Sequence, residues 1–536
     1  MFDYRNPYPS TRLPVFARNM VATSHPLAAQ AGLRMLQQGG NAVDAAVATA
    51  AAMTICEPVS NGLGSDAFCI LWDGQQLHGL NAAGRAPAQW SVDYFRRKYD
   101  AAAATPPKRG IDSVTVPGAV RAWVQLNQRF GRLPLDDVLA PAIEIAERGY
   151  AVPVVVQQKW AAAVPELQSQ PGFADAFMPR GRAPQVGEQF RFPAAAQALK
   201  RIGQTGGAAF YGGEIAAAMV RFAAAQGGVI TLADFERYQA EWVTPMSAGY
   251  RGWQVHEIGP SGQGIAALMA LGMLGQFDLP AMGPASVDGK HLQIEAMKLA
   301  FADVYRHVAD PSSMAVTVAQ MLDASYLASR ARLIRMNQAQ NFGTGLPAQG
   351  GTIYLAAADD SGMMVSFIQS NYLGFGSGCV EPTFGISLQN RGHGFSLRAD
   401  SPNVVAPGKR PFHTIIPAFL TRDGQPVMAF GVMGAHMQPQ GHVQALVHML
   451  DHGLNPQAAC DAPRWRVNPD GTLNVEAGAD PLLAQALAER GHRIEGIHDS
   501  YQDFGAAQFI WRLGDAATAG YVGASDSRRD GLVAGW

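Results

Sequence analysis

The segment that most constrains the fold lies where two apolar runs follow a pair of glycines. Thr352 comes directly after the glycines, and mainly apolar residues fill 353–359 and 363–370. Asp-Ser-Gly stands between the two runs, and these residue types favour tight turns. The segment therefore predicts an antiparallel hairpin of buried strands, with Thr352 at the start of the first strand.

Two further segments carry the same hairpin signal. Residues 414–420 and 426–432 flank Arg-Asp-Gly, and two short apolar runs flank Asp73 and Gly74. Asp-Gly between apolar runs is a strong indication of a hairpin. Because helical patterns lie outside these strand pairs, we expect antiparallel sheets covered by helices, which is a layered α/β sandwich.

Helical patterns occupy most of the rest of the chain. Ser24 can cap a helix whose first turn holds Pro26. Asn41 can cap a second helix, which is rich in alanine and is expected to be buried. Residues 120–345 are mostly helical as well. The 536 residues suffice for two to four packing units, since one domain usually holds about 100–200 residues.

The composition argues against several classes of partner. The formal charge is −2 with no run of lysine or arginine, whereas a nucleic-acid partner needs a basic stripe. No stretch of 18 or more apolar residues is present, so we expect no membrane span. Residues 1–20 lack an apolar core behind a positive start, so we expect no signal peptide and a cytoplasmic protein. The cysteines lie far apart without a CxxC pair, which favours free buried thiols: Cys56, Cys69, Cys379 and Cys460.

Standard catalytic and cofactor motifs are absent from the sequence, including G-x-S-x-G, the phosphate-binding loop and H-E-x-x-H. The segment GPSGQG at 259–264 precedes a helix and could hold an anion on backbone N–H groups, although a plain structural turn is the commoner role. His448 and His452 have a spacing that metal sites use, but no carboxylate motif accompanies them. Solvated or core histidines are therefore favoured, and we expect no metal and no cofactor.

Thr352 allows two interpretations. A threonine at the start of a strand is common, because threonine favours strands. If the chain were cut before Thr352, however, the new α-amine would become the general base for the threonine hydroxyl. An α-amino pKa of about 7.7–8.0 leaves much of that amine neutral near pH 7. The preceding glycines tolerate the strained bend that self-cleavage needs. These residues alone leave both interpretations open.

Longer motifs carry a resemblance that covers nearly the whole chain. They begin with MVATSHPLAAQAGLRMLQQGGNAVDAA at residue 20 and continue with SVTVPGAV, EAMKLAFADVY, PGKRPFHTIIPAFL and GASDSRRDG. In these motifs the chain resembles the γ-glutamyltransferase family of self-cleaving N-terminal-nucleophile hydrolases. The resemblance implies a four-layer αββα fold and autocleavage of a precursor between Gly351 and Thr352. It also implies a large subunit, 1–351, a small subunit, 352–536, and a dimer of such heterodimers.

The resemblance carries catalytic roles onto four residues. Thr352 matches the nucleophile, and Ser370 matches the hydroxyl residue that supports it. Gly434 and Ala435 match a Gly-Gly pair whose backbone N–H groups form the oxyanion hole. Alanine keeps its N–H, so the substitution preserves that function.

Substrate-binding roles carry over unevenly. Arg85 matches the arginine that holds the substrate's α-carboxylate, and a guanidinium fork suits a carboxylate for geometric reasons as well. His413 and Thr414 stand where the family has two serines that bind carboxylate. Thr414 can still donate a hydrogen bond from its hydroxyl.

The part that would hold the substrate's α-ammonium departs from the family. His393 and Gly394 replace an acidic pair, so no carboxylate remains there. Tyr372 replaces an asparagine that helps to bind the same group, and Arg391 replaces a neutral residue. A buried cation without an acceptor costs several kcal/mol, so this site disfavours an ammonium. An ion pair with a nearby aspartate is the alternative role for Arg391, since an interior arginine is usually paired.

These departures resemble glutaryl-cephalosporin acylases and oxamate amidohydrolases, which act on amides of acids without an α-amino group. The expected function is hydrolysis of linear amides of small carboxylate-bearing acids through an acyl-threonine intermediate. Two alternatives stay open at this point. One is a true γ-glutamyl transpeptidase or glutathione hydrolase, and the other is a non-catalytic member that binds small acids.

Overall fold

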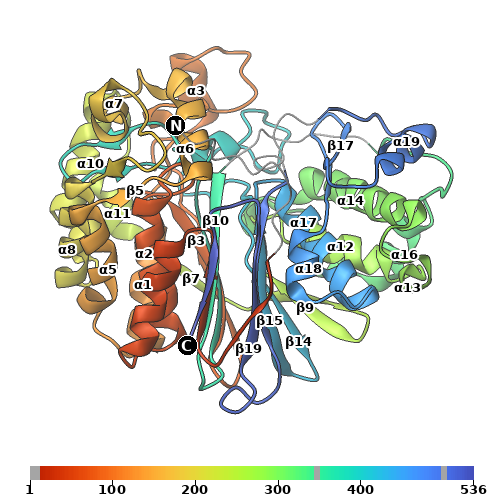
Figure 1. Cartoon of the computed structure of the whole chain (residues 1–536). Helices are drawn as coiled ribbons and strands as arrows, with labels where there is room; N and C mark the ends of the chain where they lie inside the picture. The colour runs from red at the N-terminus through yellow and green to blue at the C-terminus, as the bar shows by residue number, and fades with distance from the viewer. Residues whose placement is uncertain (1–11, 343–350, 497–503) are drawn as a thin grey trace.

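Two seven-stranded antiparallel sheets stack face to face in the computed structural model of the chain, and helices cover both outer sides (Figure 1). The structure describes residues 12–342, 351–496 and 504–536. The order of the layers is helix, sheet, sheet, helix. The layered αββα sandwich expected from the sequence is therefore confirmed.

The first sheet contains Thr352 in one of its central strands. The strand order is β20-β2-β10-β11-β3-β4-β7, so β10 pairs with β2 on one side and with β11 on the other. The strands are β2 Met20–Thr23, β3 Asp66–Trp72, β4 Leu77–Ala82, β7 Glu241–Val243, β10 Gly351–Ala358, β11 Met364–Tyr372 and β20 Leu532–Gly535.

The second sheet faces the first and carries the strand that leads into the glycine-alanine pair at 434–435. Its order is β1-β19-β18-β15-β14-β9-β8. The strands are β1 Val15–Ala17, β8 Met246–Tyr250, β9 Trp253–Glu257, β14 Ala418–Arg422, β15 Gln425–Met433, β18 Ala506–Arg512 and β19 Tyr521–Ser525.

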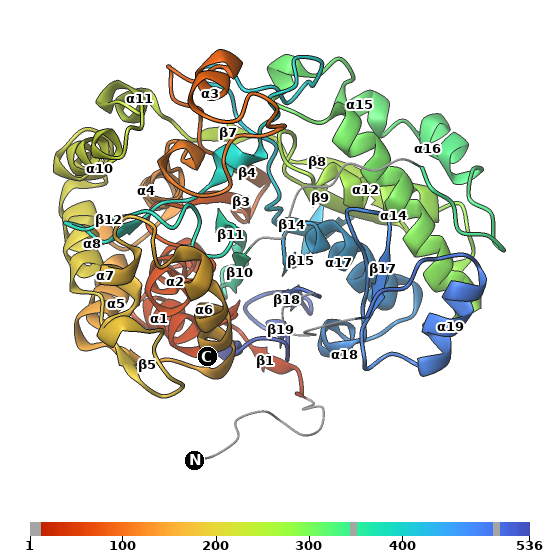
Figure 2. The ribbon, with the colours of Figure 1, turned by 90° about the horizontal axis from the view of Figure 1, so that it is seen from above.

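Each sheet is covered by its own set of helices (Figures 1 and 2). The set on the first sheet includes α1 Pro26–Gln37, α2 Ala42–Cys56, α4 Ala119–Phe130, α5 Leu135–Arg148 and α8 Pro193–Thr205. The set on the second sheet includes α12 Ile265–Leu274, α14 Val287–His307, α16 Ala324–Ala331, α17 Met437–Leu446 and α18 Pro456–Asp461. Every side chain of α2 is buried, as its alanine-rich sequence predicts.

Strand β10 is buried on both faces because it lies between α2 and the second sheet. Ile353 and Leu355 pack in the core under the helices, whereas Tyr354 and Ala356 pack in the core between the sheets. This alternation is the period of two that a strand imposes on its side chains. Apolar residues on both faces explain why the sequence shows a continuous apolar run here.

The helix starts agree with the sequence except for one cap. Asn41 caps α2 as predicted, with a reciprocal hydrogen bond that completes a capping box. Helix α1 is capped by His25 and not by Ser24, because His25 Nδ1 accepts the Leu27 N–H over 3.2 Å. The Ser24 hydroxyl instead donates to Glu57 over 2.7 Å, so it is not available to the helix.

The start of one predicted strand needs correction. Strand β14 begins at Ala418 and not at residue 414, because side chains from elsewhere bind the backbone just before it. Gln438 Oε1 accepts the Ile416 N–H over 2.9 Å, and Gln263 Nε2 donates to the Thr414 carbonyl over 2.6 Å. The stretch 120–345, predicted as mostly helical, also contains the hairpin β8–β9 at the edge of the second sheet.

All four cysteines are buried and free, as expected. Among the described residues, no helix combines the length and the apolar character needed to cross a bilayer.

Candidate active site

Thr352 lies at an irregular point of the β10–β11 pairing. Gly351 faces Tyr372 and Ile353 faces Gln369, so β11 accommodates one extra residue opposite Thr352. Such a bulge changes the direction of a side chain and is frequent next to active sites. Only 3% of Thr352 is exposed, so its hydroxyl is enclosed by protein atoms.

The Thr352 hydroxyl is held by one group from the neighbouring strand β11 and one from helix α17, which covers the second sheet. Its Oγ donates to Ser370 Oγ over 3.2 Å and accepts a hydrogen bond from Gln438 Nε2 over 3.4 Å. Ser370 Oγ also accepts the Tyr372 N–H over 2.8 Å. The structure therefore brings Thr352 and Ser370 together, as the resemblance implies. Gln438 was not predicted, and its position shortly after the GVMGAH motif was the only signal in the sequence.

Gly434 and Ala435 form a tight turn between β15 and α17, with φ angles of 120° and 52°. Their carbonyls accept the first N–H groups of the helix, from Met437 over 2.9 Å and from Gln438 over 3.1 Å. Within the described part of the chain, neither the Gly434 nor the Ala435 N–H donates a backbone hydrogen bond. Both N–H groups are thus available for an anion, which is what an oxyanion hole requires.

Gln263 joins two parts of this region. Its Nε2 donates to the Ala435 carbonyl over 2.8 Å as well as to the Thr414 carbonyl. Its backbone N–H donates to the His413 carbonyl over 3.0 Å. The GPSGQG segment is therefore a structural turn whose glutamine supports the glycine-alanine turn, and no anion is needed to explain it.

Arg391 is completely buried, and part of its guanidinium has no partner. Nη1 donates to Thr414 Oγ over 2.9 Å, and the guanidinium lies 4.7 Å from the centre of the Tyr372 ring. In the described structure Nε and Nη2 have no hydrogen-bond partner. Buried donors without partners are costly, so the arrangement is suited to an anion that would accept from both atoms.

The ion pair considered for Arg391 is not formed among the described residues. The carboxylate in question is Asp66, and His413 Nε2 occupies one of its oxygens over 3.2 Å. His413 Nδ1 accepts the Ile415 N–H over 3.4 Å, so the Nε2 proton points to Asp66. Burial keeps the pKa of His413 well below its usual value, helped by the nearby Arg391 guanidinium. His413 is therefore neutral at pH 7.

Asp66 and Arg391 influence each other through space. Burial raises the pKa of the Asp66 carboxyl to about 6, although the Arg391 charge opposes that rise. Burial lowers the pKa of Arg391 to about 10, with Asp66 opposing that change. Arg391 stays charged at pH 7, and Asp66 changes its charge near neutrality. No role for Asp66 was predicted, although it lies in the GLGSDAF motif.

Arg85 belongs to a different group of side chains, nearer to the surface. Its Nη1 donates to the Gly408 carbonyl over 2.8 Å, and its Nη2 contacts Glu241 over 2.5 Å. Arg410 contacts the same Glu241 oxygen over 2.7 Å. A half-open pocket of about 260 Å³ lies beside Arg85. To bind a substrate carboxylate, Arg85 would have to exchange Glu241 for it.

The replacement of the acidic pair at 393–394 leaves no carboxylate at these positions. His393 Nδ1 lies 2.8 Å from the Pro106 carbonyl oxygen. A Cβ atom added to Gly394 would lie 2.9 Å from the Phe412 carbonyl oxygen, so a larger residue there would displace backbone. The closely packed glycine therefore prevents a simple return to an acidic residue.

Potential metal ligands are already used by other groups. His448 lies 3.4 Å from the Lys290 ammonium and is buried, which agrees with the expectation of a core histidine. A second set consists of His291, Glu295 and His492, whose ligand atoms all lie within 4.8 Å of one another. The Lys298 ammonium contacts Glu295 over 2.8 Å and His492 over 3.2 Å, so a lysine already supplies the cation at this place.

The chain is similar to known proteins along nearly its whole length. A family model described as gamma-glutamyltranspeptidase matches residues 28–536. The glutathione hydrolase-like YwrD proenzyme of Bacillus subtilis is 35% identical over 528 residues, 97% of this chain and 98% of that protein. The oxamate amidohydrolase proenzyme of Klebsiella pneumoniae is 34% identical over 537 residues, 97% of this chain and 99% of that protein. Among solved structures, a cephalosporin acylase from Bacillus halodurans matches with a TM-score of 0.94 and 48% identity, over 100% of this chain and 99% of that chain.

Proposed function

The chain belongs to the gamma-glutamyltranspeptidase family and is an amide-bond hydrolase of the N-terminal-nucleophile class, and we propose that its substrates are amides of small acids that carry a carboxylate and no α-amino group. We also propose that the chain is made as a precursor and cuts itself between Gly351 and Thr352. The relatives named as proenzymes support this second proposal.

The geometry around Thr352 supports a mechanism in two halves. Cleavage frees the α-amine of Thr352, which takes the hydroxyl proton while Oγ attacks the substrate carbonyl. The N–H groups of Gly434 and Ala435 hold the oxyanion. The C–N bond then breaks, the amine leaves with the proton, and an ester to Thr352 remains. Water attacks that ester, the α-amine again carries the proton, and the free acid leaves with Oγ protonated.

Arg391 is the observation on which the substrate class rests. Its Nε and Nη2 atoms are buried and have no described partner, so a carboxylate on the acyl group would satisfy both. An α-ammonium in the same place would meet a guanidinium and no described carboxylate at 393–394. The site therefore favours an acyl group such as glutaryl, succinyl or oxamoyl over γ-glutamyl.

A panel of amides with one chromogenic amine and different acyl groups tests the proposal. Glutaryl and γ-glutamyl amides differ only in the α-ammonium, which would be desolvated without an acceptor. That costs about 1–3 kcal/mol, or roughly a tenfold to hundredfold lower kcat/KM for the γ-glutamyl amide. A preference for the γ-glutamyl amide would support the alternative of a glutathione hydrolase, which the name of the Bacillus subtilis relative keeps open.

Subunit assembly is a separate part of the proposal. We infer from the family resemblance that two cleaved heterodimers associate. Light scattering of the processed protein would give about twice the 57.0 kDa of one chain in that case, and about 57 kDa if the heterodimer stays single.

A further inference from the structure

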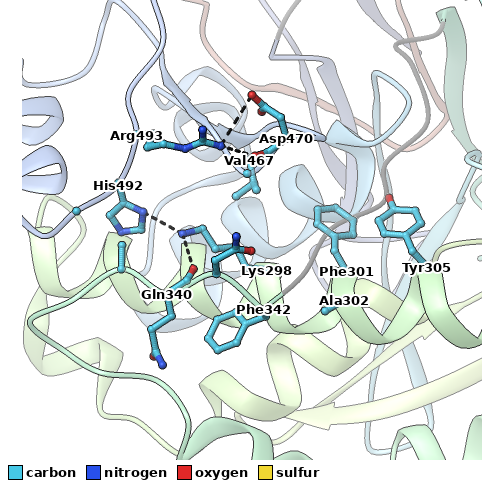
Figure 3. A pocket seen from close by; sticks show the side chains of 14 residues that line it. Lys298, Phe301, Ala302, Tyr305, Gln340, Phe342, Val467, Asp470, His492 and Arg493 are labelled. Atoms are coloured by element: carbon cyan, nitrogen blue, oxygen red, sulfur yellow. Dashed lines mark hydrogen bonds and ion pairs between the residues drawn. The ribbon is translucent and has the colours of Figure 1, made fainter.

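A second cavity, of about 420 Å³, lies on the outer side of the second sheet beside α14 (Figure 3). One wall is a single face of that helix, which presents Lys298, Phe301 and Tyr305. The opposite wall comes from the loops around residues 467–471 and 491–493. Ligand pockets usually measure about 300–1,000 Å³, so this cavity can hold a molecule with one or two rings.

The helix side of the cavity is aromatic. The rings of Phe301 and Tyr305 lie 5.5 Å apart at an angle of 29°, and Phe342 stands nearby in the same lining. Figure 3 shows the Phe301 and Tyr305 rings beside each other and pointing the same way. Such a surface suits a flat aromatic group, because stacked rings gain more than their area of burial alone.

Away from the aromatic rings, the lining carries the cations Lys298 and Arg493 and the carboxylate of Asp470. Arg493 is 66% exposed; its Nη2 donates to the backbone carbonyl of Asp470 and lies 4.0 Å from a carboxylate oxygen of the same residue, so that ion pair is weak. Lys298 is bound to Glu295, and Figure 3 shows its further contacts with His492 and with the Gln340 carbonyl oxygen, which anchor its ammonium in the wall. Arg493 is thus the cation best placed to meet an anionic group on a bound molecule.

Tyr305 connects this cavity with the proposed catalytic turn. Its hydroxyl lies 2.8 Å from His436 Nδ1, and His436 directly follows Ala435 in the chain. Two residues further, Gln438 contacts the Thr352 hydroxyl. Tyr305, at the inner end of the cavity, therefore contacts the segment between the glycine-alanine turn and the glutamine that binds Thr352. The proposed acyl site at the free Nε and Nη2 atoms of Arg391 lies elsewhere, which leaves this side for the other half of an amide.

Resting on the proposed function, we propose that this cavity binds the amine half of the substrate and favours arylamines that carry a carboxylate. The aromatic ring would stack against Phe301 and Phe342, and the carboxylate would face Arg493. The carbonyl carbon would then sit at Thr352 with the amine side toward Tyr305. Nothing in the acyl part of the site requires this preference, so the two proposals can be tested apart.

Two glutaryl anilides provide the first test. They are the 4-nitroanilide and the 3-carboxy-4-nitroanilide, which differ only in the carboxylate. We expect Arg493→Gln to lower the ratio of kcat/KM, carboxylated over plain, by about twofold to fivefold, the size of an exposed charge contact. Arg201→Gln is the matched control, because Arg201 is an exposed, ion-paired arginine on α8 at the other side of the molecule (Figure 1). An unchanged ratio in Arg493→Gln would overturn the proposal.

Direct binding of the free amine separates this inference from the acyl preference. The processed protein is titrated with 5-amino-2-nitrobenzoate, the amine released from the carboxylated anilide, and the dissociation constant is measured by calorimetry. We expect weaker binding by Arg493→Gln and by Phe301→Ala than by Arg201→Gln. Equal binding by all three variants would refute the cavity as the amine site, even if the acyl preference proved right. Binding that follows the expected order would stand even if the acyl preference proved wrong.

Discussion

The hydroxyl of Thr352 donates a hydrogen bond to Ser370 Oγ over 3.2 Å, across the bulged end of the β10–β11 hairpin. Ser370 Oγ is fixed in turn by the Tyr372 N–H. The threonine oxygen is therefore oriented before any cleavage, and its second contact, to Gln438, comes from helix α17 on the second sheet. A nucleophile held in one rotamer loses little entropy when it attacks.

Thr352→Ala should leave one uncut chain without amidase activity, because the same hydroxyl serves self-cleavage and turnover. Thr352→Ser should keep part of both, since serine retains the hydroxyl. A denaturing gel after incubation and an assay with a glutaryl amide measure the two effects. Normal processing of the alanine variant would end the assignment of Thr352 as the nucleophile.

Arg391 and Arg85 are the two candidates for binding the substrate carboxylate, and their surroundings favour Arg391. Arg391→Met should lower kcat/KM for a glutaryl amide by more than about thirtyfold, the effect of losing a buried charge-assisted pair worth roughly 2–5 kcal/mol. Arg85→Ala should have the smaller effect, because Arg85 already binds Glu241. Self-cleavage should persist in both variants. A larger loss in Arg85→Ala would move the carboxylate site to Arg85.

The thermal stability of Arg391→Met shows whether Arg391 also supports the fold. Arg391→Met removes two buried donors that have no described partner and puts an apolar side chain in their place, so it removes the cost of burying those donors. Its melting temperature should therefore equal or exceed that of the wild type. A clear drop would mean that Arg391 supports the fold and would weaken the kinetic argument.

Substrate affinity should depend on pH through Asp66. Below its pKa of about 6 the Asp66 carboxyl is neutral, so the Arg391 charge acts on an anionic acyl group without opposition. Above pH 6 the carboxylate opposes that charge. We expect KM for a glutaryl amide to rise between pH 5.5 and 7.5 by roughly fivefold to thirtyfold, for a charge effect on the order of 1–2 kcal/mol.

Asp66→Asn is the control for this pH dependence, because asparagine has no charge to gain. KM of that variant should stay flat over the same range. A wild-type KM that does not change with pH would show that Asp66 and the acyl group are not coupled.

The glycine-alanine turn allows a sharp pair of substitutions. Ala435 has a φ of 52°, a region that costs non-glycine residues about 1–2 kcal/mol, so Ala435→Gly should fold as well as the wild type or better and remain active. Gly434 has a φ of 120°, and an added Cβ would lie 2.9 Å from Gly505 Cα. Gly434→Ala should therefore lose activity and stability. The melting temperature and kcat/KM of the two variants are measured. Equal values for Ala435→Gly and Gly434→Ala would contradict the prediction.

Local patterns predicted the strands and helices around the site well. The run after Thr352 is apolar on both faces because β10 is packed from both sides, and Asn41 caps α2 through its own side chain. Ser24 shows the limit of such patterns. The sequence predicts a cap from a hydroxyl residue next to the helix start. In the fold, the Ser24 hydroxyl instead binds Glu57, 33 residues away in the sequence.

Contacts between distant segments could not be predicted in the same way. Gln438 and Asp66 lie in segments that meet only after the two sheets have packed, and the motifs next to them in the sequence do not say which groups they contact. The environment of Arg391 depends on which side chain binds Asp66, and in the structure that side chain is His413. The sequence left an ion pair as the alternative, and the distances decide against it. Gly394 likewise reveals its tight packing only through the Phe412 backbone.

Each sheet is built from strands on both sides of residue 352. In the first sheet β2, β3, β4 and β7 precede it, while β10, β11 and β20 follow it; the second sheet mixes β1, β8 and β9 with β14, β15, β18 and β19. A cut at this point changes the connectivity of the chain and leaves every strand pair in place. The two pieces would not come apart on dilution. Once denatured, however, they would have to find each other and interleave their strands again, a bimolecular route that the intact precursor never faces.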